Sequence, residues 1–212
     1  MKNILFILLF MSSGFYGFSQ IRSGLLFDLS DSWTKNELWP SEYGDHNYGS
    51  DQSHIVVENR KWKSRMSFGI GYQIQYEKNR YLFDAAVLYQ NKGVHVSYFE
   101  TGKDYEYTKR LNGIGFKLII NRYIWDKFYL GIGCEPIFWG NTHVSKTVHK
   151  KYWDTPLVAQ AGYNFKNIQL NAFFKYGLFP IFETVGMTHK AYGRDLGISL
   201  FIPLDSFKQL LH

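Results

Sequence analysis

The chain has a single cysteine and no long apolar run beyond its first residues, and both shortages limit the classes of protein to consider. With Cys134 as the only cysteine among 212 residues, no disulfide can form within the chain. After the first twenty residues no run of eighteen apolar residues occurs, so we expect no transmembrane helix. Gly-rich phosphate loops, Cys/His zinc spacings and nucleotide motifs are also missing, and we predict no cofactor and no metal.

Charge is sparse as well, at 20% of residues, and the formal excess of +6 is scattered along the chain. No Lys/Arg cluster lies on a helical pattern, so we do not expect a nucleic acid partner. Aromatic residues, by contrast, make up 19% of the chain. Few charges and many aromatics are typical of a transmembrane β-barrel, whose strands mix apolar with polar residues.

The segment 66–77, MSFGIGYQIQYE, has an apolar residue at every even position and a small or polar residue at every odd one. Strict alternation over this length predicts a β-strand with two different faces. The same alternation recurs in eight segments, at residues 23–29, 66–77, 81–90, 113–121, 128–138, 157–165, 168–177 and 195–202. We therefore predict an all-β fold, an eight-stranded antiparallel up-and-down transmembrane β-barrel.

The lengths of the connections support a barrel with two different rims. Short turns are expected at 77–79, 122–126 and 166–167, and longer links at 31–65, 146–153 and 183–190. The link at 100–103 is short but lies between extended strands. Bacterial barrels have short turns on the periplasmic rim and long loops outside, so 31–65 is predicted to be a long first extracellular loop.

The polar face of the predicted strands is small enough to fit the narrow interior of an eight-stranded barrel. We expect charges of both signs to pair in this lumen, and the residues concerned are Arg22, Asp28, Asp84, Lys117, Glu135 and Lys175. One alternative stays open, a soluble lipocalin-like barrel with its large residues inside, because periodicity alone does not say which face is interior.

The first residues predict export. Lys2 precedes the apolar stretch 4–11, and small residues follow at 17–19, where a signal peptidase would cut. We predict a signal peptide at 1–19, a barrel at 20–204 and a C-terminal tail at 205–212, with the protein integral to the bacterial outer membrane. No cysteine stands directly after the apolar stretch, so this is not a lipoprotein signal.

The second half of the chain carries a family resemblance. It reads LNGIGFKLIINRYIWDKFYLGIG, then LVAQAGYNFKNIQLNAFFKYGLFPI and finally LGISLFIPL. These strands resemble the outer-membrane β-barrel family of Bacteroidetes grouped around PorT. The resemblance implies the barrel fold and suggests a link to protein secretion, and its motifs are strand motifs with no catalytic content. The chain departs from many outer-membrane barrels by ending in DSFKQLLH after its last strand.

One short pattern raises the question of catalysis. His95 and Ser97 are two residues apart, so they share a strand face and could act as base and nucleophile in a lipid A deacylase-like enzyme. Apolar residues occupy odd positions up to Tyr89 but even positions from Val94. We interpret this change of phase as a β-bulge within 90–93, which would turn both residues inward as ordinary polar lining.

The predicted loops contain the remaining candidates. Tryptophans in a loop either mark a contact surface or pack on the barrel rim. Histidines and lysines after the fifth strand either meet anionic lipid headgroups or are simply solvated. The possible interaction surface comprises Trp33, Trp39, Trp62, His143, Lys146, His149, Lys150 and Lys151.

These observations favour a non-catalytic structural or interaction barrel, an accessory of a secretion or envelope-assembly complex. Its expected partners are outer-membrane lipids and proteins of the outer membrane or periplasm. An outer-leaflet lipid-modifying enzyme and a small-ligand-binding barrel are the alternatives.

Overall fold

The computed structural model describes residues 20–36, 65–100, 103–140, 148–150, 152–165, 167–184 and 190–204. Nearly all of them lie in strands, and none of the described residues forms a helix long and apolar enough to cross a membrane. The strands are β1 (Gln20–Asn36), β2 (Arg65–Lys78), β3 (Tyr81–Glu100), β4 (Lys103–Tyr123), β5 (Phe128–Cys134), β6 (Ile137–Trp139), β7 (Val148–Lys150), β8 (Trp153–Asp154), β9 (Pro156–Asn164), β10 (Gln169–Thr184) and β11 (Lys190–Pro203).

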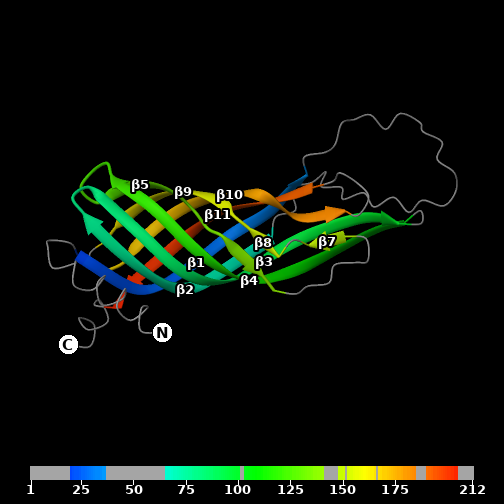
Figure 1. Cartoon of the computed structure of the whole chain (residues 1–212), viewed down its shortest axis with the longest axis horizontal. Helices are drawn as coiled ribbons and strands as arrows, with labels where there is room; N and C mark the ends of the chain where they lie inside the picture. The colour runs from blue at the N-terminus through cyan, green and yellow to red at the C-terminus, as the bar shows by residue number, and fades with distance from the viewer. Residues whose placement is uncertain are drawn as a thin grey trace, which may run out of the picture.

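The strands form one antiparallel sheet that closes on itself (Figure 1). Around the barrel the order is β3-β2-β1-β11-β10-β9-β5-β4, and the β3–β4 pairing closes the ring. The short strands extend these eight positions rather than adding new ones. β6 continues β5 along the edge of β4, β8 pairs with β6, and β7 pairs with the far end of β10. The predicted eight-stranded antiparallel up-and-down barrel is confirmed, and closure leaves no free edge where the ring is complete.

The connections differ between the two ends of the barrel. At one end β2 and β3 are joined through Asn79 and Arg80, and Asn79 has the left-handed backbone (φ 57°) that asparagine tolerates in tight turns. The turns at 124–127 and 165–168 lie at the same end and are closed by backbone hydrogen bonds such as that from Phe165 N to Ile168 O (2.9 Å). Gln20 pairs with Glu77, so β1 starts at this end too. The predicted short turns are therefore observed together at one end, whereas large parts of the predicted long links 31–65, 146–153 and 183–190 lie outside the described residues.

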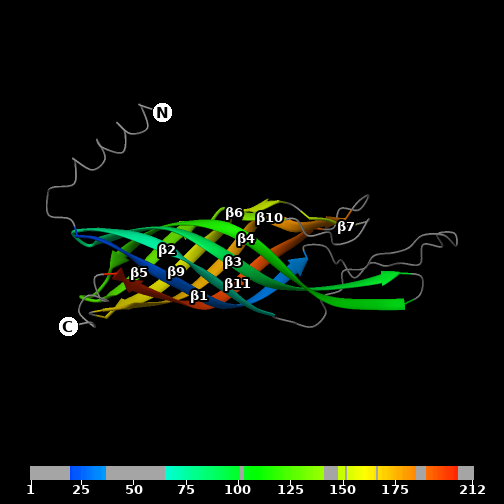
Figure 2. The same cartoon turned by 90° about the horizontal axis from the view of Figure 1, so that it is seen from below.

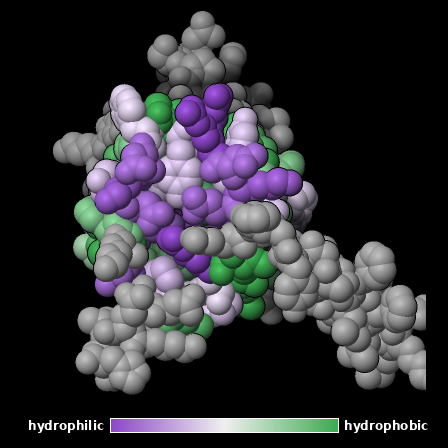
Figure 3. All heavy atoms as spheres, turned by 90° about the vertical axis from the view of Figure 1, so that its left-hand side faces the viewer, coloured by the Kyte–Doolittle hydropathy of each residue, from purple (hydrophilic) through white to green (hydrophobic). Residues whose placement is uncertain are grey.

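Side chains alternate between the two sides of the barrel wall as predicted. On β2 the even residues from Met66 to Ile74 are exposed on the outside, whereas Ser67, Gln73 and Gln75 are buried inside. The same holds on β4, where Leu118 is exposed and Lys117 is buried. The outer surface of this barrel is thus mainly apolar. Figure 3 shows hydrophilic residues gathered over the end with the short turns and hydrophobic residues around the circumference.

This distribution decides which solvent the apolar face contacts. A soluble barrel would bury its large apolar residues in the interior, but here Ile132 is 73% exposed while Lys117 is 2% exposed. Only lipid makes such an exterior favourable, because it replaces water around the apolar side chains. On β3 the alternation of exposed apolar and buried residues runs from Tyr81 to Tyr89, a segment of nine residues. A tilted transmembrane strand needs roughly 9–11 residues to span a bilayer, so the length fits. The protein is a transmembrane barrel of the outer-membrane type.

The β-bulge predicted within 90–93 is wrong, and so is the inward turn of His95 and Ser97 that it implied, because both positions stay on the side of the wall to which Tyr89 belongs. β3 pairs with β4 without a register shift from Tyr81 opposite Arg122 to Glu100 opposite Lys103. The phase change in the sequence arises instead because the hairpin extends past the apolar belt, where the surroundings of its two faces change. The irregularity lies in β10, whose register with β11 shifts on either side of Pro180. Since proline has no N–H to donate to a ladder, it is confined in sheets to edges, strand starts and bulges.

Two strand boundaries also differ from the prediction. β1 continues to Asn36, which pairs with Ala191 of β11. The first long link therefore begins after Asn36 and not at residue 31, because β11 is long enough to pair with β1 up to that point. The hairpin of β3 and β4 is the longest element and projects well beyond the rest of the barrel, as Figures 1 and 2 both show. The predicted signal peptide at 1–19 and the tail at 205–212 lie outside the described residues.

Candidate functional site

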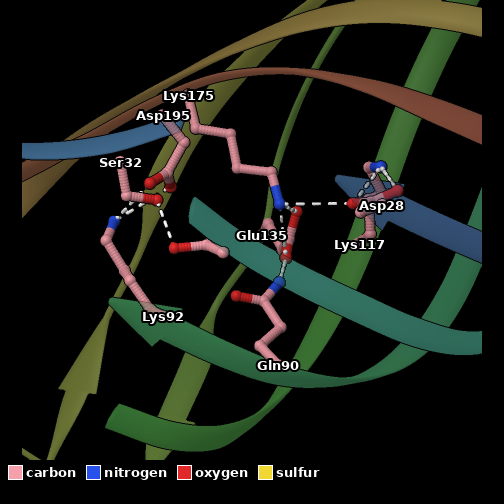
Figure 4. Close-up of polar contacts among 9 residues, drawn as sticks. Asp28, Ser32, Gln90, Lys92, Lys117, Glu135, Lys175 and Asp195 are labelled. Atoms are coloured by element: carbon pink, nitrogen blue, oxygen red, sulfur yellow. Dashed lines mark hydrogen bonds and ion pairs between the residues drawn. The ribbon is translucent and has the colours of Figure 1, made fainter. Parts of the chain in front are cut away.

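The lumen contains a central charge cluster of Asp28, Lys117, Glu135 and Lys175, contributed by β1, β4, the link after β5, and β10 (Figure 4). Lys175 Nζ lies 2.9 Å from Glu135 Oε2 and 3.4 Å from Asp28 Oδ2, and Lys117 Nζ lies 3.1 Å from the same Asp28 oxygen. All four side chains are buried. Two ammonium groups thus face two carboxylates, which makes the cluster electrically balanced.

Neighbouring groups complete the coordination of the cluster. Gln90 Nε2 donates a hydrogen bond to Glu135 Oε1. The Phe173 ring lies beside both lysines, with its centroid 4.8 Å from Lys175 Nζ and 5.1 Å from Lys117 Nζ. A cation over an aromatic face is stabilised by the ring quadrupole, most strongly where water is excluded. The cluster therefore holds its charges by paired ions, an amide and an aromatic ring.

A second, mainly neutral network lies nearer the short turns and surrounds Asp84. Gln75 and Asn121 donate to its two oxygens at 2.9 and 2.7 Å, and Gln160 donates at 3.4 Å. Gln75 also donates to Gln169 Oε1 at 2.6 Å. This carboxylate is held by amide donors from three strands, β2, β4 and β9, and its contacts close the lumen at the end with the short turns.

A third contact lies toward the opposite end. Lys92 Nζ is 2.8 Å from Asp195 Oδ1, and both side chains are buried. Nearby, Ser32 donates to the hydroxyl of Ser67 at 2.6 Å, and that hydroxyl also accepts from the backbone N–H of Gly93 at 2.9 Å. Polar contacts therefore continue along the barrel axis on both sides of the central charge cluster.

Apolar side chains fill the spaces between these polar contacts. One cluster is formed by Leu26, Ala86, Leu88 and Phe201, and another by Ile119, Val158 and Phe173. An eight-stranded barrel has an interior just wide enough for side chains to fill it, and this lumen is filled in that way. The contacts along the described lumen are mainly electrostatic and brace the barrel wall.

The predicted lumen residues separate into three groups. Asp28, Lys117, Glu135 and Lys175 come together as one cluster, and Asp84 is buried in the separate amide network. Arg22 pairs with Gln75 in the register, close to the start of β1, and is only partly buried. The prediction that charges of both signs meet in the lumen is correct for the first group.

The predicted interaction surface is placed only in part. Trp33 lies in β1 opposite Arg194, not in a loop, and its ring centroid is 6.4 Å from that of Phe174. His149 and Lys150 belong to β7 and pair with Glu183 and Phe182 of β10, so this part of the predicted loop is a strand. The remaining predicted residues, Trp39, Trp62, His143, Lys146 and Lys151, lie outside the described residues.

Sequence reasoning missed Lys92, Asp195, Gln90 and Phe173 as members of the lumen contacts. Lys92 and Gln90 fell inside the segment interpreted as a bulge, although simple alternation from Asp84 places both inside. Phe173 is a large apolar residue at an inward position, flanked by outward Ala172 and Phe174. A single aromatic on the polar face of this strand, two residues from Lys175, was the signal available for its role.

Comparison with known proteins gives likeness of shape only. No model of a known protein family matches the chain, and no curated protein matches it. Among solved structures, the crystal structure of Neisserial surface protein A (NspA) is similar with a TM-score of 0.45 and 11% identity, covering 86% of this chain and 98% of NspA. The structure of Ail, the attachment invasion locus protein of Yersinia pestis, in complex with the heparin analogue sucrose octasulfate, has a TM-score of 0.34 and 13% identity, covering 86% and 99%. Neither likeness bears on the function of this chain.

Proposed function

We propose that the protein is a non-catalytic outer-membrane barrel that acts by contacts at its extracellular side, as an accessory of a secretion or envelope-assembly complex. The observation that carries this proposal is the combination of a filled lumen with a hairpin that extends beyond the apolar belt. A filled lumen offers no transport route, so the surface outside the membrane is the part left for function. The resemblance to the PorT group supports the secretion setting and remains a prediction.

The β3–β4 hairpin supports contacts through its sequence. Beyond the belt, Val96 pairs with Tyr107 and Tyr98 with Tyr105, whereas Ser97 pairs with Glu106 and His95 with Thr108. Successive residues of a strand belong to opposite faces, so by register the valine and tyrosines of these pairs share one face of the hairpin, here called the apolar face, and the serine, glutamate, histidine and threonine share the other. Aromatic residues are enriched at protein interfaces, and the apolar face is the better candidate for binding a partner.

A purification of the tagged full-length chain from native outer membranes in mild detergent tests this function. The wild type is expected to bring a stoichiometric partner, and the double variant Tyr98→Ser/Tyr105→Ser is expected to lose most of it, about tenfold, as hot-spot residues do. The control is Ser97→Ala/Thr108→Ala on the other face, which should retain the partner. Recovery of a lone barrel from the wild type, or equal recovery with both variants, would refute the proposed role.

The filled lumen leads to a second expectation, that the barrel does not conduct. Purified protein added to planar bilayers should give no steady channels, because the central charge cluster and the apolar clusters occupy the axis. A porin reconstituted in parallel serves as the positive control. Reproducible single-channel steps from the wild type would contradict the account of the lumen.

We also propose that His95 and Ser97 have no catalytic role. Their spacing was the reason to consider them as a base and a nucleophile. In the structure His95 pairs with Thr108 on the projecting hairpin, beyond the last outward apolar residues of β3 and β4. Mass spectrometry of lipid A from cells with and without the gene should show the same acyl chains. A difference that His95→Ala abolishes would support the lipid-modifying enzyme instead.

A further inference from the structure

Arg110 occupies an unusual position on the outer wall of the barrel. It is an exposed residue of β4, and its guanidinium reaches across β3 to the next strand. Nη1 donates to the backbone oxygen of Met66 on β2 at 3.0 Å and to Asn91 Oδ1 on β3 at 2.8 Å. Asn91 Nδ2 in turn donates to Asn112 Oδ1 at 2.6 Å. A long, flexible cation is thus held in one place by three adjacent strands.

Gly93 makes this reach possible. It is the residue opposite Arg110 in the β3–β4 register. A Cβ at Gly93 would lie 2.7 Å from Arg65 Cβ and 3.1 Å from the Met66 oxygen to which Arg110 donates. The missing side chain therefore lets the backbone of β2 at Arg65 and Met66 lie close to β3, which brings the Met66 oxygen within reach of the guanidinium. This arrangement depends on two residues in register, a glycine and an arginine.

The position of Arg110 along the strand corresponds to the outer boundary of the membrane. Outward residues of β4 are apolar through Phe116 and Ile114 and then change to Asn112 and Arg110. On β3 the same change follows Tyr89. The short turns are at the opposite end, so this boundary faces the extracellular leaflet. A cation here lies at the depth of lipid headgroups.

The chemistry of the guanidinium indicates what it binds. Toward the described residues only Nη1 donates, and Arg110 is exposed, so its other N–H groups are available to a ligand. Guanidinium groups prefer phosphate and carboxylate oxygens, which accept from two N–H groups at once. Next to these contacts lie exposed apolar residues of β2 and β3, among them Phe68, which pairs with Asn91, and Tyr89, against which acyl chains can pack.

We propose that Arg110, held by Asn91 and Met66 across Gly93, binds the phosphate of a lipid in the outer leaflet, with the acyl chains along the apolar wall below. The site joins β2, β3 and β4 where the hairpin leaves the membrane. Lipid bound there stabilises the base of the hairpin at the membrane surface. This inference stands apart from the proposed partner binding, which concerns residues farther along the hairpin.

Native mass spectrometry of the full-length protein in non-ionic detergent, titrated with dioleoyl phosphatidic acid, tests the proposal. Dioleoylglycerol, which has the same chains and no phosphate, should bind less well. Arg110→Gln is expected to weaken phosphatidic acid binding about fivefold, as the loss of one cation at a membrane surface does. Gly93→Val should weaken it in the same direction with Arg110 intact, and Lys78→Gln at the opposite rim should change nothing. Variants are compared only where heating still shifts their gel mobility, which shows a folded barrel.

Equal phosphatidic acid affinity in the wild type and Arg110→Gln would overturn the proposal, as would equal binding of dioleoylglycerol. A third arm separates a lipid from a small anion. If millimolar inorganic phosphate displaces phosphatidic acid, the site binds free phosphate and the lipid assignment is wrong. Retention of the lipid in phosphate buffer is the expected result.

Discussion

Replacing Lys175 by methionine is expected to cost about 3–5 kcal/mol of the free energy of unfolding, because it leaves a buried carboxylate without its cation. Lys175 is the shared partner of the central charge cluster, close to both Glu135 and Asp28. After the substitution Asp28 still has Lys117, but among the described residues Glu135 retains only the amide of Gln90. The lysine would also vacate its position beside Phe173. Denaturant titration of the barrel in lipid vesicles measures this loss.

The control for this prediction is Lys117→Met, which removes an equal charge from the same cluster. Asp28 then still faces Lys175, so the loss should be clearly smaller. Combining Lys175→Met with Glu135→Gln should recover part of the stability, because the unpaired charge is removed together with its partner. If Lys117→Met proves as damaging as Lys175→Met, Lys175 does not hold the cluster together.

An arginine in place of Leu118 is expected to destabilise the barrel in a bilayer by about 2–4 kcal/mol, the cost of a cation on the lipid face near the midplane of the membrane. Leu118 is 54% exposed on the outside, between Phe116 and Ile120. In a soluble protein an already exposed leucine could be replaced by arginine at a cost within about 0.5 kcal/mol. The loss of unfolding free energy therefore distinguishes a Leu118 that contacts lipid from one that contacts water.

Ile124→Arg provides the control just beyond the end of the same strand. Ile124 is exposed in the turn at the end with the short turns, where a cation costs only about 0–1 kcal/mol. Free energies of unfolding of both variants in vesicles give the comparison. Equal, small effects at positions 124 and 118 would mean that Leu118 does not contact lipid.

Much of this fold could be predicted from residue types, because successive side chains of a strand in a barrel wall alternate between two sides. One side contacts lipid and the other faces the lumen, so each side selects its own residue types. The segment 66–77 shows this most plainly, since its apolar and polar positions are the outward and inward ones observed. The short turns followed from the same pattern, where alternation breaks for only a few residues. Closure of the sheet was also implied, because lipid leaves no tolerable place for an open edge.

The errors arose where one strand passes between two environments. In β3 the alternation of apolar residues changes phase after Tyr89, and a bulge was the local explanation. In the structure the β3–β4 register is unbroken, and the phase change of the apolar residues falls at the membrane boundary. The position of that boundary cannot be read from the pattern of neighbouring residues. The ion pairs in the lumen could not be predicted from the sequence for a different reason. Alternation shows that Lys92 and Asp195 are inward, but the tilt and closure of the sheet decide that they meet each other.

The central claim is that the even face of β2 contacts lipid, and spin labels along this strand test it most directly. Cys134 is first changed to serine, and a nitroxide is then attached at single cysteines introduced from position 68 to position 75 in vesicles. We expect collisions with oxygen, which concentrates in lipid, to peak at Phe68, Ile70, Tyr72 and Ile74 and to fall at the residues between them. Higher collision rates with a water-soluble nickel complex than with oxygen at those four positions would contradict a transmembrane barrel.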